Sequence, residues 1–180
     1  MAQSQEAQNQ EAQNQDLNAT LKLIAEVSGL SKDEVQRMYE QAKKGATVAE
    51  MFKIPPASLE AGYTLAYNLF SAGKYHDAET MFRGLCQYDD FNPRNWVGLG
   101  CCLEKRASYR EAAFCFAHAA DLGYPLNPKP LFLLAQCLCA IKDMESARKV
   151  LDIAIESGDE NNVEQMRYRK MAQELKDSLA

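Results

Sequence analysis

An internal repeat of 34 to 35 residues constrains the fold of this 180-residue chain more than any other feature of its sequence. Residues 59–92 align with residues 93–126 without a gap, and one inserted residue brings a third copy, residues 128–161, into the same register. The aligned hydrophobic and small positions are Leu65, Ala66, Leu69, Tyr75, Ala78 and Phe82; then Leu99, Gly100, Leu103, Tyr109, Ala112 and Phe116; then Leu134, Ala135, Leu138, Met144, Ala147 and Leu151. Because a unit of this length cannot bury its hydrophobic face alone, the copies are expected to stack on one another.

Two positions in every copy hold a small residue, which lets two helix backbones approach closely while bulky Leu and Phe fill the gaps around them. They are Ala66, Gly100 and Ala135 in the first half of the copies and Ala78, Ala112 and Ala147 in the second half. The period and the small residues are typical of the tetratricopeptide repeat. We therefore predict an all-α fold, a solenoid of three helix-turn-helix repeats with N-terminal helices and a C-terminal capping helix over residues 162–180.

The N-terminal region divides into a polar tail and a helical segment. Residues 1–15 contain EAQNQ twice and offer too little apolar surface to offset the entropy of ordering, so we predict a disordered Gln/Asn-rich tail. Residues 16–58 show apolar residues at helical spacing and a capping-box pair, Ser31 and Glu34. Their apolar faces need a partner, either the body of the protein or a second subunit. The dimerisation candidates are Leu21, Ile24, Val35 and Met38.

Charge, hydropathy and motifs argue against several classes of protein. The net charge of −5 and a pI near 5.1 disfavour direct binding of nucleic acid. The longest apolar stretch, residues 131–141, is too short to span a bilayer, and the N-terminus does not resemble a secretory signal. We therefore expect a cytoplasmic protein without stable membrane insertion. The sequence has no GxSxG, HExxH, GxGxxG or P-loop motif, so we expect neither an enzyme nor a cofactor.

The six cysteines are expected to be buried thiols. No two of them have CxxC spacing, and without an export signal a reducing compartment is expected. A free Cys usually behaves as a small buried hydrophobe, so we predict no disulfide and no metal site.

The concave side of such a solenoid is lined by the first helix of each repeat. The second, fifth, ninth and twelfth positions of each repeat are expected to face it. The predicted peptide-binding residues among them are Tyr63, Tyr67, Phe70, Arg94, Val97, Cys101, Phe132 and Gln136. The three aromatic residues of the first repeat are either an apolar groove for an extended peptide or ordinary core covered by the N-terminal helices. Lys and Arg are too few here for a surface that binds acidic chain ends.

The chain also resembles a known family over residues 45–154. The segments that carry the resemblance are GAT at 45–47, IP at 54–55, AYN at 66–68, GKYHDAE at 73–79, FRGLCQYDDFNP at 82–93 and GLG at 98–100. They are similar to the class II chaperones of type III secretion systems, which hold the hydrophobic, pore-forming translocator proteins in the bacterial cytoplasm. Gly62 departs from the family pattern, which has a large side chain at that position.

The resemblance implies a cytoplasmic chaperone that captures an extended apolar segment of a translocator in the concave groove. It also implies a homodimer formed through the N-terminal helices, and some members of the family co-activate an AraC-type transcription factor. The alternative from another class is a generic tetratricopeptide scaffold that joins two folded proteins. The two differ in the partner, because a scaffold binds a folded domain or a charged tail and a translocator chaperone binds an apolar unfolded segment.

Overall fold

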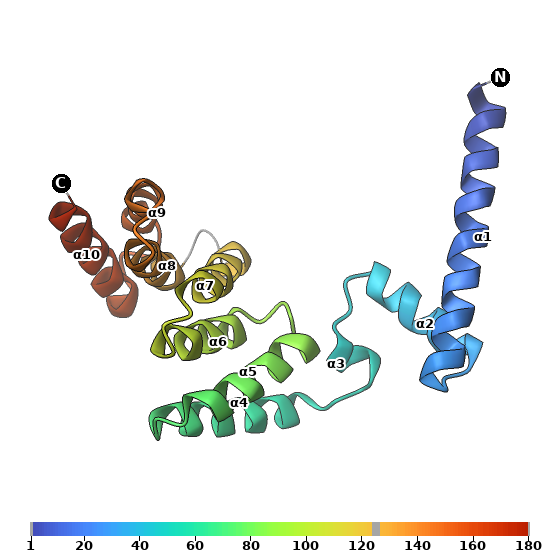
Figure 1. Ribbon diagram of the computed structural model, residues 1–180, viewed down its shortest axis with the longest axis horizontal. Helices are drawn as coiled ribbons and strands as arrows, with labels where there is room; N and C mark the ends of the chain where they lie inside the picture. Colours follow the sequence, from blue (N-terminus) through green and yellow to red (C-terminus); the bar gives the residue numbers. More distant parts are fainter. Residues whose placement is uncertain (1, 124–126, 180) are drawn as a thin grey trace. The chain divides into compact units, whose positions relative to one another are not determined.

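The computed structural model describes residues 2–123 and 127–179, and over these residues the protein consists of α-helices without a β-strand (Figure 1). This confirms the predicted all-α class. Residues 1, 124–126 and 180, which include the end of the second predicted repeat, lie outside the described residues. The chain divides into two compact units, Met1–Phe52 and Lys53–Ala180, and each is described by itself.

The first unit begins with a long helix where the sequence predicts a disordered tail. Its helices are α1 (Ala2–Ser28), α2 (Lys32–Lys43) and α3 (Val48–Met51). The prediction for residues 1–15 considered only how much apolar surface the tail could bury. Ala, Gln and Glu are strong helix formers and make up four of the five residues of each EAQNQ segment, so local propensity favours a helix there although Asn does not.

Local caps set the start of α2 and α3. Glu34 N–H donates to Ser31 Oγ at 3.3 Å, and Ser31 N–H donates to Glu34 Oε2 at 2.8 Å, which is the predicted capping box. Thr47 and Glu50 form the same arrangement at the start of α3. The core of the unit is small, with Leu21, Ala25 and Val35 buried between α1 and α2.

The second unit contains the three predicted repeats as three helix pairs, followed by one further helix. The pairs are α4 (Pro56–Ser71) with α5 (Tyr75–Tyr88), α6 (Pro93–Lys105) with α7 (Tyr109–Gly123), and α8 (Pro128–Ala140) with α9 (Met144–Glu156). Each helix packs on the next one along the chain, as Figure 1 shows for the green to orange helices. The last helix, α10 (Val163–Ser178), packs against both α8 and α9.

The small residues of the repeat pattern lie where the helices meet. Ala66, Ala78, Ala112, Ala135 and Ala147 are completely buried. The GLG segment of α6 has a related role, because the ring of Phe82 lies against Gly98 and the ring of Phe116 against Gly100. A β-carbon added at Gly98 would stand 2.3 Å from the Phe82 ring, and one at Gly100 would stand 2.6 Å from the Phe116 ring. Only glycine leaves room for these two phenylalanines.

One carboxylate joins the first two repeats. Glu79 on α5 is buried and accepts hydrogen bonds from Arg83 Nε at 2.9 Å and from Arg106, which follows α6. Burial acts to raise the pKa of Glu79, but its hydrogen bonds from Arg106 and Arg83 outweigh it, so the pKa lies below its ordinary value. Arg83 also reaches Glu111 on α7 at 3.1 Å. The carboxylate of Glu79 is therefore held ionised at neutral pH.

All six cysteines are free thiols. Burial raises the pKa of Cys86, Cys102 and Cys137 to about 12, so these thiols are unreactive at neutral pH. They pack with Cys115 in the core of the repeats as small hydrophobes.

Candidate peptide-binding groove

The aromatic residues of the first repeat differ in how far they are packed. The Tyr63 ring is half-buried and meets the Phe82 ring edge-on at 5.6 Å, and Phe70 is half-buried beside Tyr75 at 5.3 Å. Tyr67 lies between them on α4 and keeps 57% of its surface exposed. Tyr63 and Phe70 are therefore anchored in the unit, whereas Tyr67 offers most of its ring to a partner.

Helix α6 contacts α4 and continues the same surface into the second repeat. Arg94 lies over the Tyr63 ring at 4.1 Å, and both of its terminal nitrogens are 3.3 Å from the carboxylate of Glu60. Val97 is half-buried and packs against the core. Cys101 is half-buried as well, and burial raises the pKa of its thiol to about 11. The second repeat thus contributes an apolar strip, Val97 and Cys101, and one cation, Arg94. Arg94 already forms an ion pair with Glu60 of the first repeat.

The third repeat does not present its predicted groove residues in the same way. Phe132 is only 4% exposed, because α10 covers it and places Tyr168 at 5.8 Å from its ring. Lys129 is also held by α10, at 3.3 Å from Glu164. The prediction of an open Phe132 was wrong, since the repeat pattern does not show which helix the capping segment folds over. Gln136 is exposed as expected. The candidate groove is therefore the surface of Tyr63, Tyr67, Phe70, Arg94, Val97 and Cys101.

The dimerisation candidates divide into buried and exposed residues. Leu21 and Val35 are buried against each other inside the first unit, so they cannot serve as contact residues for a second subunit while this packing holds. Met38 is half-buried. Ile24 is exposed and shares α1 with two other exposed residues, Leu23 and Val27. The sequence pattern identified an apolar helix correctly but did not show that α2 covers one side of it.

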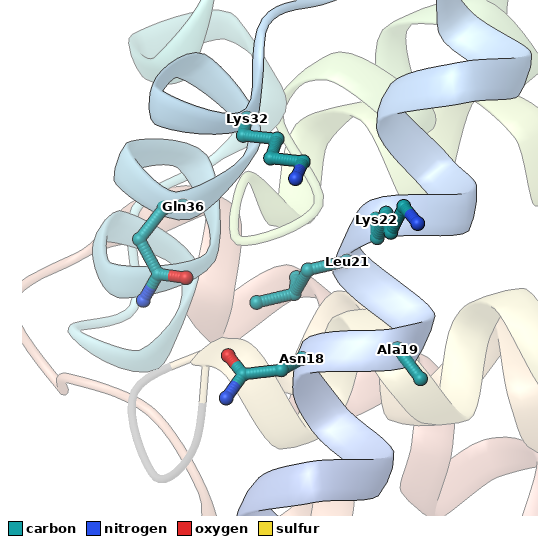
Figure 2. Close-up of a pocket in the computed structure, with 6 residues that line it drawn as sticks. All are labelled: Asn18, Ala19, Leu21, Lys22, Lys32 and Gln36. Carbon is teal, nitrogen blue, oxygen red and sulfur yellow. The ribbon is translucent and has the colours of Figure 1, made fainter.

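A cavity of about 430 Å³ lies beside this packing, between α1 and α2. Figure 2 shows Asn18 and Leu21 extending from α1 toward α2. The lining residues are Asn18, Ala19, Leu21, Lys22, Lys32 and Gln36. Lys22 already has Glu26 at 3.9 Å, and no aromatic residue lines the cavity. It therefore lacks the aromatic lining of the candidate groove.

Two features of the second unit were not predicted. An apolar cavity of about 400 Å³ opens in the first repeat. Its lining residues are Ile54, Ser58, Leu59, Thr80, Met81, Gly84, Leu85 and Tyr88. In the second repeat, the rings of Trp96 and His118 lie 4.4 Å apart, and Phe114 lies parallel to His118 at 6.4 Å. The sequence carried a signal for both features, because at a shift of 34 residues the three aromatic residues of the second repeat align with small residues of the first. Trp96 aligns with Gly62, Phe114 with Thr80 and His118 with Gly84.

The arrangement defines a class of protein, a tetratricopeptide-type helical solenoid with exposed and half-buried aromatic residues on the first helix of its first repeat and no cluster of metal-ligating side chains among the described residues. Over the same residues, no helix combines the length and hydropathy needed to cross a membrane. No family model matches the chain.

Known proteins are similar to it. Low calcium response locus protein H of Yersinia pestis is 34% identical over 116 residues, which are 63% of this chain and 67% of that protein. Chaperone protein SicA of Salmonella typhimurium is 26% identical over 76% of this chain and 82% of its own length.

Among solved structures, the type III secretion translocator chaperone SycD of Yersinia enterocolitica has a TM-score of 0.68 at 28% identity, covering 74% of this chain and 98% of that one. SycD has also been solved as an alternative dimer and in complex with a peptide of the translocator YopD. This chain therefore belongs to the family of low calcium response locus protein H and SycD, the class II translocator chaperones of type III secretion systems.

Proposed function

We propose that this protein is a cytoplasmic bacterial chaperone that binds hydrophobic translocator proteins of a type III secretion system before their export. Membership of the translocator-chaperone family and the complex of SycD with a YopD peptide support the proposal. The observation in this chain that carries it is Tyr67, an exposed aromatic residue on α4 between two anchored ones.

The chemistry of the groove fits an extended apolar segment. Exposed aromatic residues supply most of the binding energy in such surfaces when a partner removes them from water. Tyr63 and Phe70 are already fixed by Phe82 and Tyr75, so they lose little rotational freedom when a segment binds. A translocator segment held here is kept from aggregating or entering a membrane, and the chaperone does not need to fold it.

Co-expression with the proteins encoded next to the gene, and with a translocator among them, tests the proposal. We expect a soluble complex in which a short apolar segment of the translocator is protected from proteolysis. A complex that forms only with an intact folded domain, or only with a charged tail, would instead indicate the scaffold function.

We also propose that the protein forms a homodimer through the exposed face of α1, which carries Leu23, Ile24 and Val27. The alternative dimer of SycD supports self-association in the family. Ile24 and Ile153 are matched residues for a test, because they are 45% and 43% exposed and lie in different units. Ile24→Lys is expected to lower the mass measured by light scattering, whereas Ile153→Lys leaves it unchanged. An equal effect of the two variants, or no effect of Ile24→Lys, contradicts the assignment to α1.

Co-activation of an AraC-type regulator is a further expectation from the family. A reporter of that regulator, measured with and without the chaperone and in the presence of excess translocator, tests it. Activation that depends on the chaperone and falls when translocator is added is the expected result.

A further inference from the structure

Tyr63 is the one aromatic residue of the candidate groove whose ring a cation covers among the described residues. Toward the core, the ring meets the buried Phe82 ring edge-on at 5.6 Å. Toward solvent, the Arg94 guanidinium lies over it at 4.1 Å from the ring centre. Because more than half of the Arg94 side chain is itself exposed, the part of the ring that it covers is the part that a client segment would approach.

Three contacts hold Arg94 in this place. Its backbone N–H donates to Asn92 Oδ1 at 3.2 Å, which fixes the start of α6. Its two terminal nitrogens donate to the two carboxylate oxygens of Glu60 on α4, each at 3.3 Å, and form a bidentate ion pair. Its planar guanidinium lies over the Tyr63 ring, a contact for which arginine is better suited than lysine. The side chain therefore bridges the first two repeats on the groove surface.

This bridge can open without disturbing the core. The side chains of Arg94 and Glu60 are 54% and 61% exposed, and an ion pair this exposed is weak because water competes for both groups. A cation over a partly exposed ring is similarly weak. The backbone of Arg94 is held by its cap, so only the side chain has to turn away. The contact between Tyr63 and Phe82 does not involve Arg94 and is kept when the bridge opens.

The equivalent cation of the third repeat is held differently. Lys129 follows Arg94 by one repeat, and its Nζ lies 3.3 Å from Glu164 and 5.5 Å from the centre of the Tyr168 ring. Both partners belong to α10, which packs against α8, and the Lys129 side chain is only 34% exposed. Lys129 is therefore fixed beside a packed helix, whereas Arg94 is an exposed side chain placed directly over a groove residue.

We propose that Arg94 is a specificity-determining gate of the candidate groove. In the free protein the gate is closed on Tyr63 and Glu60, and a client segment reaches the Tyr63 ring only by displacing the guanidinium. A large apolar side chain gains more free energy on that ring than the guanidinium loses, whereas a small or polar side chain does not. The gate therefore selects segments with a large apolar side chain at the first repeat. The proposal rests on the proposed function and adds to it how the groove discriminates among segments.

The test measures the affinity of the full-length protein for the protease-protected translocator segment of the co-expression complex, made as a synthetic peptide with blocked ends. Arg94→Ala is expected to bind this peptide about fivefold more tightly than the wild-type protein, the effect of losing one exposed ion pair and one cation–π contact. Sodium chloride is expected to narrow this difference, because salt screens the ion pair that closes the gate. Weaker binding by Arg94→Ala would show that Arg94 contacts the client directly, and it would overturn the proposal.

Lys129→Ala is the matched control, because it removes a cation at the equivalent position of the third repeat. It is expected to leave the affinity unchanged, and equal tightening by the two variants would contradict the gate. If Arg94→Ala lowers the melting temperature, Glu60→Gln repeats the test with Arg94 in place. Alanine replacements along the peptide then locate the side chain that opens the gate. At one apolar position the replacement is expected to abolish the advantage of Arg94→Ala, and an advantage that survives every replacement overturns the proposal.

A second readout needs no client. In NMR spectra of the isotope-labelled protein, the ring current of Tyr63 is expected to shift the side-chain signals of Arg94 upfield, and Glu60→Gln moves them back toward ordinary values. Ordinary values in the free wild-type protein, or signals that a bound peptide leaves in place, overturn the proposal. Peptide binding that Arg94→Ala does not change refutes only the gate. Absence of peptide binding in both the wild-type protein and the Arg94→Ala variant refutes the proposed function.

Discussion

The first two repeats share their core but place their aromatic residues on different faces. At a shift of 34 residues, Ala66 corresponds to Gly100 and Phe82 to Phe116, and all four are buried. On the groove side, the first repeat has Tyr63, Tyr67 and Phe70 where the second has Val97, Cys101 and Glu104. The helix pairs therefore form from the same buried positions although their surfaces differ.

Away from the groove, the second repeat has the aromatic residues and the first repeat has the small ones. Trp96, Phe114 and His118 form an aromatic cluster in the second repeat, and the first repeat has Gly62, Thr80 and Gly84 at these positions. The apolar cavity of the first repeat is lined by two of these smaller residues, Thr80 and Gly84. The comparison teaches that the repeat pattern specifies packing, while each face is free to acquire its own binding chemistry.

The largest loss of stability is expected when a methyl group is added at Gly98, where α6 approaches the Phe82 ring. Gly98→Ala places a β-carbon 2.3 Å from Phe82, so we expect a loss of about 2–3 kcal/mol in the free energy of unfolding. Gly62→Ala is the comparison in the first repeat, where the nearest atom, Leu85 Cδ2, is 3.3 Å away. It is expected to change stability by less than about 1 kcal/mol, because the higher helix propensity of Ala offsets the tighter contact. Urea denaturation measures both. Similar losses in the two variants would contradict the difference in packing.

The ion pairs of Glu79 give the next largest effect. In the second repeat the same position is Ala113, so only the first repeat has a buried carboxylate here. Because the folded-state pKa of Glu79 lies below its ordinary value of 4.5, its contribution is fully present above that value and is lost as the pH falls through the folded-state pKa. We expect Glu79→Gln to cost about 1–2 kcal/mol at neutral pH and less in acid. Thermal unfolding from pH 7 to pH 3 checks this, and a cost that does not change with pH would exclude the ionised pair as the cause.

The smallest effect concerns the turns between the paired helices. Gly73, Ala107 and Lys142 occupy equivalent turns with φ of 76°, 60° and 66°, a left-handed conformation that suits glycine. Ala107→Gly is therefore expected to stabilise the second repeat by up to about 1 kcal/mol, and Gly73→Ala to destabilise the first by about as much. Differential scanning calorimetry of both variants measures the pair. Shifts of the same sign would show that the turn conformation does not decide the effect.

The sequence predicted the helix pairs well because their boundaries follow from a period and from small residues at crossings. It failed at Phe132 and Leu21, since burial there depends on which side of the repeat α10 and α2 cover, and apolar spacing is compatible with either side. The burial of Asn95 could not be predicted, because an asparagine in the first turn of a helix is usually exposed to solvent. Its burial depends on the approach of the end of α5, which no local pattern encodes.

The central claim is that Tyr67 belongs to a binding surface and not to the core. Its most direct test measures the affinity of the full-length protein for an apolar translocator segment, together with the melting temperature, for Tyr67→Ala and for Tyr88→Ala. Tyr88 is the matched control, an exposed tyrosine on α5 of the same repeat that lies outside the candidate groove. We predict that Tyr67→Ala weakens binding about 30-fold with an unchanged melting temperature, as expected for an aromatic anchor, and that Tyr88→Ala leaves the affinity unchanged. An unchanged affinity for Tyr67→Ala, or a loss of binding that accompanies a sharp fall in melting temperature, would contradict the account.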